Sequence, residues 1–213
     1  MSRPDTATRI ARRAERNGVD AAPDVVRALA QYFDLLLHWN RTVNLTALGD
    51  DEEALDRLVI EPLAASRALP SSGLLLDVGS GGGSPAIPLR VAVPGLRLVM
   101  VESKTRKAAF LREVVRQLRL EDVRVEARRL EELLAEAGLH EAADVVSIRA
   151  VRVDRRLLTR LLAFVRPQGH IYLFSGPGIG GPVVERPWVF DGERQLVAAL
   201  GSRLLMLRKD VPA

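Results

Sequence analysis

Residues 74–102 read LLLDVGSGGGSPAIPLRVAVPGLRLVMVE, and the rest of the chain can be arranged around them. Residues 74–78 form an apolar run, which is typical of a strand buried on both faces of a parallel sheet. The glycine-rich segment 79–84 follows, and it predicts a turn that a ligand can approach closely because no Cβ atom intervenes. A second apolar run, 96–101, ends at Glu102. This order of strand, glycine turn and strand predicts a nucleotide-type binding site.

The spacing of the glycines separates two kinds of nucleotide site. The dinucleotide fingerprint G-x-G-x-x-G would place Ser84, which is not glycine, at its third position. The pattern D-x-G-x-G-x-G fits without exception, and its members are Asp77, Gly79, Gly81 and Gly83. This pattern resembles the first motif of S-adenosylmethionine-dependent methyltransferases. The resemblance implies S-adenosylmethionine as the cofactor, a ligand without phosphate.

The composition excludes several classes of protein. The 213 residues are 47% hydrophobic, which suffices for one domain with a sizeable core and an appendage. No apolar run approaches the roughly 18 residues of a membrane helix, and the first residues do not resemble a signal peptide, so we expect a cytoplasmic protein without a membrane partner. The absence of cysteine excludes thiolate chemistry. No metal site is predicted, because the three histidines are scattered: His38, His140 and His170.

The basic residues suggest an RNA partner. The net charge is only +4, but 28 of the 31 basic residues are arginine, and they gather in groups. Arginine binds phosphate bidentately and stacks on bases. The alternative is that arginine-rich usage reflects a GC-rich genome or solvated helix faces. The groups are Arg9, Arg12, Arg13 and Arg16; Lys104, Arg106, Lys107, Arg112, Arg116 and Arg119; and Arg149, Arg152, Arg155 and Arg156.

The first 70 residues are predicted to form a helical appendage, and residues 71–213 the main domain. Asp50 and Glu53 resemble a capping box, and Pro62 should kink or restart the helix that follows. The expected elements are a short helix or mobile arm at 1–20, a core-facing helix at 23–38, a turn at 39–46 and a linker at 70–73.

Beyond residue 73, apolar strand-like runs alternate with helical patterns. This alternation predicts an α/β fold, a sheet of parallel strands with helices on both faces. Together with the glycine pattern, the resemblance to methyltransferases implies a Rossmann-like class I methyltransferase fold. Ligands of such sheets bind beyond the carboxyl ends of the strands. The expected strands are 74–78, 96–101, 123–127, 145–148 and 171–174, and the expected helices are 104–120, 131–137 and 157–165. A turn is expected at 167–169. Residues 196–199 and 203–207 could form a hairpin at the sheet edge.

Three acidic residues are candidates for the binding site. Asp77 ends a buried strand, where it could orient the glycine turn or a ligand's ammonium group, or merely cap the following helix. Glu102 ends the second strand, where a carboxylate can accept hydrogen bonds from both ribose hydroxyls; otherwise it is a solvated glutamate. Glu131 follows the third strand and could border an adenine ring, or it could simply begin a helix.

Four segments resemble the ribosomal small-subunit methyltransferase G family, also called glucose-inhibited division protein B. They are residues 39–47, 77–89, 102–111 and 147–151, and the likeness extends over about residues 25 to 175. The resemblance implies an N-terminal helical part on a Rossmann-like methyltransferase domain. It also implies that the protein methylates N7 of a guanine in 16S ribosomal RNA. We expect a monomer that acts on this RNA or on the small ribosomal subunit. It places the cofactor contacts at Gly79, Ser84, Leu130, Glu131 and Arg149, with the ribose acid at Glu102. From its position at the end of the fourth strand we expect Arg149 to be the side chain nearest the reaction, in contact with cofactor or guanine; otherwise it is a phosphate-binding or surface arginine.

The proposed chemistry agrees with the residues that the chain lacks. Guanine N7 offers a neutral lone pair and needs no catalytic base, so alignment is the enzyme's main task. The missing cysteine excludes the covalent route to pyrimidine C5, and no Asn-Pro-Pro-aromatic segment typical of exocyclic-amine methylation is present.

The chain departs from the family pattern where a substrate should approach. Leu58 replaces a histidine, Glu61-Pro62 replaces Asp-Ser, Ser175 replaces a lysine, Ala86 replaces a glycine, and a loop at 176–182 replaces a helix. Two alternatives therefore stay open. One is a methyltransferase of the same fold that acts on a small molecule or another RNA, and the other is a non-catalytic RNA-binding module.

Overall fold

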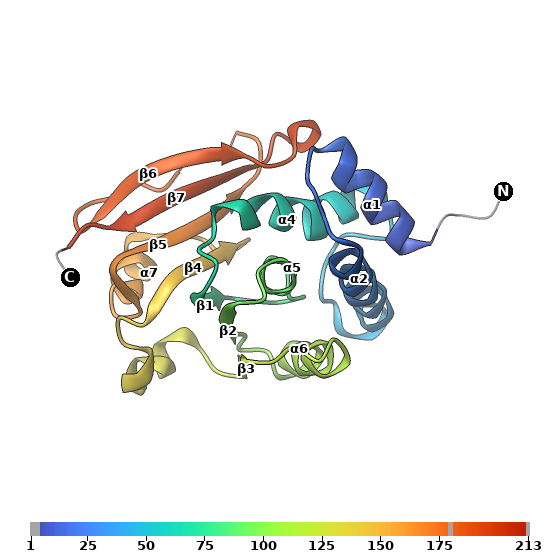
Figure 1. Ribbon diagram of the computed structural model, residues 1–213. Coiled ribbons are helices and arrows are strands. Elements are labelled where there is room, and N and C mark those ends of the chain that lie inside the picture. Colours follow the sequence, from blue (N-terminus) through green and yellow to red (C-terminus); the bar gives the residue numbers. More distant parts are fainter. Residues whose placement is uncertain (1–4, 179–180, 212–213) are drawn as a thin grey trace.

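A computed structural model describes residues 5–178 and 181–211 (Figure 1). Its centre is a seven-stranded sheet with the strand order β3-β2-β1-β4-β5-β7-β6. The first five strands are parallel, whereas β7 is antiparallel to β5 and to β6. The strands are β1 Gly73–Val78, β2 Leu96–Val101, β3 Val123–Glu126, β4 Ala143–Arg149, β5 Val165–Ser175, β6 Trp188–Gln195 and β7 Arg203–Lys209.

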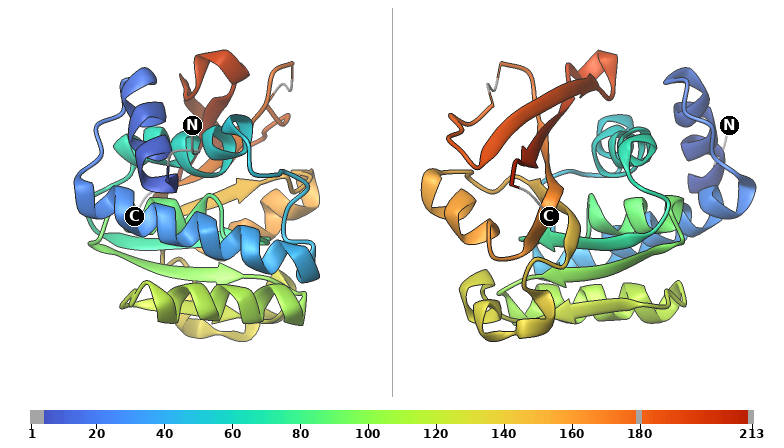
Figure 2. Two further views of the ribbon diagram at one scale, coloured as in Figure 1. Left: turned by 90° about the vertical axis from the view of Figure 1, so that its right-hand side faces the viewer. Right: turned by 60° about the vertical axis from the view of Figure 1, so that its left-hand side comes forward.

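Helices cover both faces of the sheet (Figures 1 and 2). Successive residues of a strand point to opposite faces, so Leu75 joins the cluster formed with α1, α2, α5 and α6, while Leu74 and Leu76 join the cluster beneath α7. The longer helices are α1 Thr6–Arg16, α2 Pro23–Val43, α5 Ala86–Ala92, α6 Thr105–Gln117 and α7 Arg155–Leu161. Short helical segments are α3 Glu52–Leu55, α4 Glu61–Ala65 and 3₁₀ turns at Ser66–Ala68, Leu130–Ala135, Ala137–Leu139 and Ala198–Leu200.

The second helix is longer than the sequence indicated. We expected a turn from Trp39, but α2 continues to Val43 and ends at Asn44, whose φ of 50° is left-handed. The reason is tertiary, because Trp39 packs against Phe110 with ring centroids 5.8 Å apart. The expected turn is therefore confined to the residues after Val43.

The predicted capping box at Asp50 and Glu53 is wrong. Asp51 caps α3 instead, since its carboxylate accepts a hydrogen bond of 2.7 Å from the Ala54 N–H. Asp50 forms an ion pair of 2.7 Å with Arg9.

Two of the four arginines in the N-terminal group, Arg9 and Arg13, form internal ion pairs. Arg9 is only 6% exposed and also bonds Glu52 at 3.0 Å, while Arg13 pairs with the buried Asp56. These contacts tie α1 to the segment that begins at α3. Of this group, only Arg12 and Arg16 remain exposed and thus accessible to a nucleic acid.

The predicted irregularity at Pro62 appears as a π-helix, Asp56–Ile60, between α3 and α4. Proline has no N–H to donate to the preceding turn. The carbonyl oxygens of Arg57 and Leu58 accept from side chains of the main domain instead, Arg149 and Ser84 respectively. These two backbone acceptors connect the π-helix to residues that are distant in the sequence.

The C-terminal strands differ most from the expectation. Strand β5 begins at Val165 and runs through the predicted turn at 167–169, where Gln168 adopts a φ of 60° and the pairing with β4 is irregular. The first strand of the hairpin is Trp188–Gln195 rather than 196–199, and it is anchored where Trp188 Nε1 donates to Leu158 O at 3.0 Å. The predicted loop at 176–182 lies partly outside the described residues.

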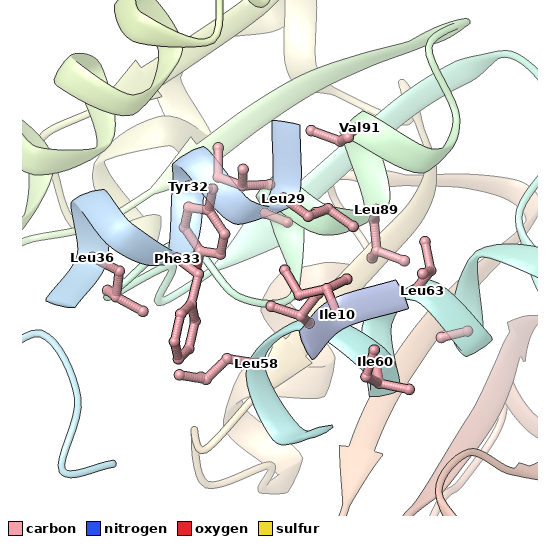
Figure 3. Packing of buried hydrophobic residues seen from close by; sticks show 14 of the residues in the cluster. Ile10, Leu29, Tyr32, Phe33, Leu36, Leu58, Ile60, Leu63, Leu89 and Val91 are labelled. Carbon is pink, nitrogen blue, oxygen red and sulfur yellow. The ribbon is translucent and has the colours of Figure 1, made fainter. Parts of the chain in front are cut away.

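The helical region and the sheet share one hydrophobic cluster. Figure 3 shows Ile10, Phe33 and Leu58 from the first 70 residues packed near Leu89 of α5. The boundary at residues 70 and 71 stays a prediction. None of the helices in the described part of the chain is long and apolar enough to cross a membrane.

Candidate active site at the carboxyl ends of the strands

The glycine turn after β1 adopts a backbone that other residues rarely tolerate. Gly79, Gly81 and Gly83 have φ values of 73°, 51° and 88°. A Cβ atom at Gly79 would lie 2.7 Å from Cγ2 of Val151, and one at Gly83 would lie 3.0 Å from Cγ1 of Ile87. Glycine is therefore required by conformation at all three positions and by close packing at Gly79 and Gly83.

Glu102 is held against this turn. Its carboxylate accepts a hydrogen bond of 2.9 Å from the Gly81 N–H and one of 2.7 Å from the Lys104 N–H. The side chain is 7% exposed and lines the cavity described below. Two backbone donors thus fix the carboxylate while it still borders the space where hydroxyl groups of a ligand could lie.

Asp77 lies beneath the turn and does not line the cavity. It is 1% exposed, and its Oδ1 accepts a hydrogen bond of 2.5 Å from Ser147 Oγ, the residue opposite it on β4. Burial raises the pKa of Asp77 to about 6, although the hydrogen bonds from Ser147 and Ser80 oppose the shift. Asp77 therefore ties the start of the turn to β4, and the sequence did not reveal Ser147 as its partner.

Two adjoining cavities open at this edge of the sheet. The larger, of about 340 Å³, contains Ser84, Glu102 and Arg149 in its walls, and the other, of about 240 Å³, contains Leu130 and Glu131. Gly79 and Val151 line both. The structure thus brings the predicted residues to two adjoining hollows rather than to one. The larger cavity is also lined by Leu36, Leu45, Thr46, Ala47, Leu58 and Lys107.

Glu131 is not free at the mouth of the smaller hollow. Its carboxylate forms an ion pair of 2.6 Å with Arg160 of α7. A ligand in that hollow would meet Glu131 through its backbone or through the outer side of this pair.

Arg149 ends β4 and is enclosed by partners. Its Nη2 lies 2.9 Å from Oε2 of Glu61, and its Nη1 donates to Arg57 O and, at 3.3 Å, to Ser84 Oγ. The guanidinium also lies 4.5 Å from the centre of the Phe174 ring, a cation–π contact. The predicted pair Arg149 and Ser84 is therefore brought together, but both side chains are bound to the helical region.

Sequence reasoning missed Glu61 and Tyr32. Glu61 replaces the family's aspartate, and the retained acidic character was the signal that could have identified it as the partner of Arg149. Tyr32 of α2 is fully buried, and its hydroxyl donates to Gly82 O at 2.7 Å. Burial raises the pKa of this hydroxyl, so it acts as a neutral donor that holds the glycine turn.

Exposed basic residues follow the strand ends at the edge of the sheet where the cavities lie. Lys104 and Arg106 follow β2, Arg129 follows β3 and Arg152 follows β4. Because the carboxyl ends of parallel strands meet at one edge of the sheet, these charges lie on the same side of the molecule as the cavities. Within residues 5–178 and 181–211, no cluster of histidine, aspartate and glutamate is suited to bind a metal ion.

The fold is that of S-adenosylmethionine-dependent methyltransferases. An S-adenosylmethionine-dependent methyltransferase from Aquifex aeolicus matches with a TM-score of 0.56 at 13% identity, covering 76% of this chain and 95% of that one. A variant of MtNAS solved with S-adenosylmethionine matches with a TM-score of 0.54 at 15% identity, covering 96% and 73%. At such identities the likeness concerns the fold, and it confirms the predicted Rossmann-like class.

Comparison with known sequences identifies the family of this chain, which the likeness in fold does not. The family described as GidB, rRNA small subunit methyltransferase G, matches residues 25–178. Ribosomal RNA small subunit methyltransferase G of Sorangium cellulosum is 35% identical over 201 residues, which cover 90% of this chain and 83% of the relative. The protein of the same name from Stenotrophomonas maltophilia (strain K279a) is 40% identical over 154 residues, covering 72% and 66%. The chain therefore belongs to the rRNA small subunit methyltransferase G family and is an S-adenosylmethionine-dependent methyltransferase.

Proposed function

We propose that this chain transfers a methyl group from S-adenosylmethionine to N7 of a guanine in 16S ribosomal RNA. The observation that supports this proposal is the convergence of the glycine turn, Glu102 and Arg149 on one cavity with a basic rim. We further propose that the protein acts in the cytoplasm, as a monomer, on the RNA or the small ribosomal subunit. Within it, residues 1–70 would form the helical region and residues 71–213 the methyltransferase domain.

The cavity walls fit the chemistry of the cofactor. The Glu102 carboxylate is oriented by two backbone donors and retains lone pairs for the two ribose hydroxyls. The absence of a Cβ at Gly79 lets Val151 pack closely against the turn, and both residues line both hollows, so they shape the two neighbouring spaces in which we place the adenosyl group. The proposed cofactor contacts are Asp77, Gly79, Gly81, Gly83, Ser84, Glu102, Leu130, Glu131 and Arg149, with Asp77 and Gly83 acting through the shape of the turn.

The reaction asks the protein mainly for alignment. S-adenosylmethionine supplies a methyl group activated by a sulfonium, and guanine N7 supplies a lone pair that needs no deprotonation. Holding two reactants in line can lower a barrier by ~7 to 11 kcal/mol. Arg149, which lines the larger cavity at the end of β4, is the side chain that we place nearest the reacting atoms. Leu58 gives the opposite wall an apolar surface.

Labelled cofactor tests the proposal directly. The protein is incubated with methyl-labelled S-adenosylmethionine and with small subunits isolated from a strain that lacks the modification. We expect label in 16S RNA, and borohydride reduction followed by aniline scission should cut the RNA at the labelled nucleotide, as 7-methylguanosine allows. Cofactor binding without any label in the RNA would contradict the proposal.

Two alternatives have distinct outcomes. Leu58 and Ser175, where the chain departs from the family pattern, favour a different RNA or a small molecule as the acceptor. This alternative predicts cofactor binding and transfer to another acceptor but not to 16S RNA. The other alternative, a non-catalytic RNA-binding module, conflicts with the membership of a methyltransferase family; it predicts no S-adenosylmethionine binding in a calorimetric titration at millimolar ligand.

A further inference from the structure

A buried ion pair connects the helical region to the wall of the larger cavity. Arg149 Nη2 and Glu61 Oε2 are 2.9 Å apart, and the two side chains are only 16% and 6% exposed. Arg149 lines the cavity, whereas Glu61 does not. The carboxylate therefore approaches the guanidinium from the side of α4 and leaves the cavity side to the ligand.

The neighbouring charged groups have other partners. The Arg57 side chain bonds Glu53 at 2.9 Å, Asp56 pairs with Arg13, and Asp77 accepts from Ser147. Among the described residues, Glu61 is the carboxylate that forms an ion pair with Arg149. Removal of its charge would leave a buried cation in the cavity wall, because arginine cannot be deprotonated in proteins.

The charge of the methyl donor makes this compensation specific. S-adenosylmethionine carries a positive sulfonium with its transferable methyl group, whereas its product S-adenosylhomocysteine carries a neutral thioether without that methyl; the rest of the two molecules is the same. An uncompensated Arg149 would repel the first more than the second. A contact that only supports the fold would affect both ligands equally.

We propose that Glu61 is a positioning residue that cancels the charge of Arg149 and holds its guanidinium against Phe174, so that the cavity accepts a cationic methyl donor. Arg57 and Leu58, whose carbonyls accept from Arg149 and Ser84, complete this attachment of the π-helix to the cavity wall. The helical region is thereby part of the methyl-transfer site. The inference rests on the proposed placement of the cofactor in this cavity.

The test is the ratio of two affinities in the variant Glu61→Gln. Calorimetric titration of the full chain with S-adenosylmethionine and with S-adenosylhomocysteine gives both. We expect the affinity for S-adenosylmethionine to fall roughly tenfold more than that for S-adenosylhomocysteine, which equals about 1.4 kcal/mol. For two unit charges in an effective dielectric of about 20, this energy corresponds to a separation of about 12 Å, and a shorter separation would give a larger change of the ratio.

Three further variants separate charge from geometry. Glu61→Asp keeps the charge and should keep the ratio, even if both ligands bind more weakly. The double variant with Glu61→Gln and Arg149→Gln removes both charges and should restore the ratio. Asp56→Asn is the matched control, because Asp56 is a buried carboxylate of the π-helix directly before α4, and its partner Arg13 lies outside the cavity walls. This control should lower the melting temperature without changing the ratio.

Equal losses of both affinities in Glu61→Gln, or a double variant that fails to restore the ratio, would overturn the inference. If Glu61→Gln does not fold, Glu61→Asp becomes the variant that tests the inference. A tenfold change of the ratio in Glu61→Asp, which keeps the charge, would contradict a role through charge. A separate variant, Gly79→Ala, tests the placement of the cofactor. Unchanged cofactor binding in Gly79→Ala would refute the placement of the cofactor. Weakened binding in Gly79→Ala, combined with an unchanged ratio of affinities in Glu61→Gln, would refute the role of Glu61 alone.

Discussion

Substitution of Gly79 by alanine should disrupt cofactor binding more than the same change at Gly81. Gly79 has a φ of 73°, and its added Cβ would lie 2.7 Å from Cγ2 of Val151. Gly81 has a φ of 51°, but its added Cβ would meet nothing closer than Gly79 O at 3.7 Å. The two variants therefore share the strain of a left-handed backbone and differ in the steric clash.

The magnitude follows from these two contributions. A left-handed conformation costs a residue with a Cβ roughly 1–2 kcal/mol. Contacts between carbon atoms are optimal at about 3.5–4.0 Å, so Val151 or the turn must move by about 1 Å in Gly79→Ala, and overpacking of this kind costs about 1–3 kcal/mol. Because Gly79 and Val151 line both hollows, this displacement changes the shape of both. We expect Gly79→Ala to bind S-adenosylmethionine at least tenfold more weakly than Gly81→Ala does.

Calorimetric titration of the two variants, with thermal unfolding to confirm that both are folded, measures this difference. A second substitution, Val151→Ala in the Gly79→Ala background, removes the clashing Cγ2 atom and should recover part of the lost affinity. Equal affinities of the two glycine variants, or no recovery in the double variant, would show that the contact with Val151 does not shape the site.

Three other perturbations probe the residues around the turn. Glu102→Ala should weaken S-adenosylmethionine binding by ~1 to 3 kcal/mol in calorimetry, because two ribose hydroxyls lose a charged acceptor; unchanged affinity would show that the ribose acid is misassigned. Tyr32→Phe should lower the free energy of unfolding by about 1 kcal/mol in denaturant titrations, because the carbonyl of Gly82 loses its donor, and an equally stable variant would contradict that bond. The pKa of Asp77 is raised from 3.8 to about 6 in the folded state, so its ionisation opposes folding above pH 6. The contribution of Asp77 to stability should therefore rise by up to about 3 kcal/mol as the pH falls from 7 to 4, and denaturant titrations should find this rise missing in Asp77→Asn.

The strands at the centre of the sheet were predictable because their signals are local. The second predicted strand, Leu96–Val101, has the predicted boundaries, and the first differs by one residue, since burial on both faces demands continuous apolar runs. The glycine pattern was equally informative, because positive φ values at Gly79, Gly81 and Gly83 exclude most other residues. The placement of Glu102 beside the turn followed from the end of its strand.

The less accurate predictions concern segments whose conformation depends on distant partners. Trp39 stays helical through its contact with Phe110, and Arg9 and Arg13 are enclosed by carboxylates about 40 residues further along the chain. Charge composition alone could not separate these internal ion pairs from an RNA-binding surface. The C-terminal hairpin was misplaced because strand β6 has mostly exposed, polar residues and resembles a loop in hydrophobic pattern.

By itself, the sequence determined the α/β class, the glycine turn with its acidic residue at Glu102, and the membership of a methyltransferase family. Each of these rests on short-range patterns of apolar residues, glycines and motifs. Only the tertiary structure decided what Arg149 contacts, because its partner Glu61 lies 88 residues away and becomes its neighbour when α4 packs at the ends of the strands. The glycine turn where we place the methyl donor is thus determined by local sequence, whereas the ion pair of Arg149 in its cavity arises from long-range packing.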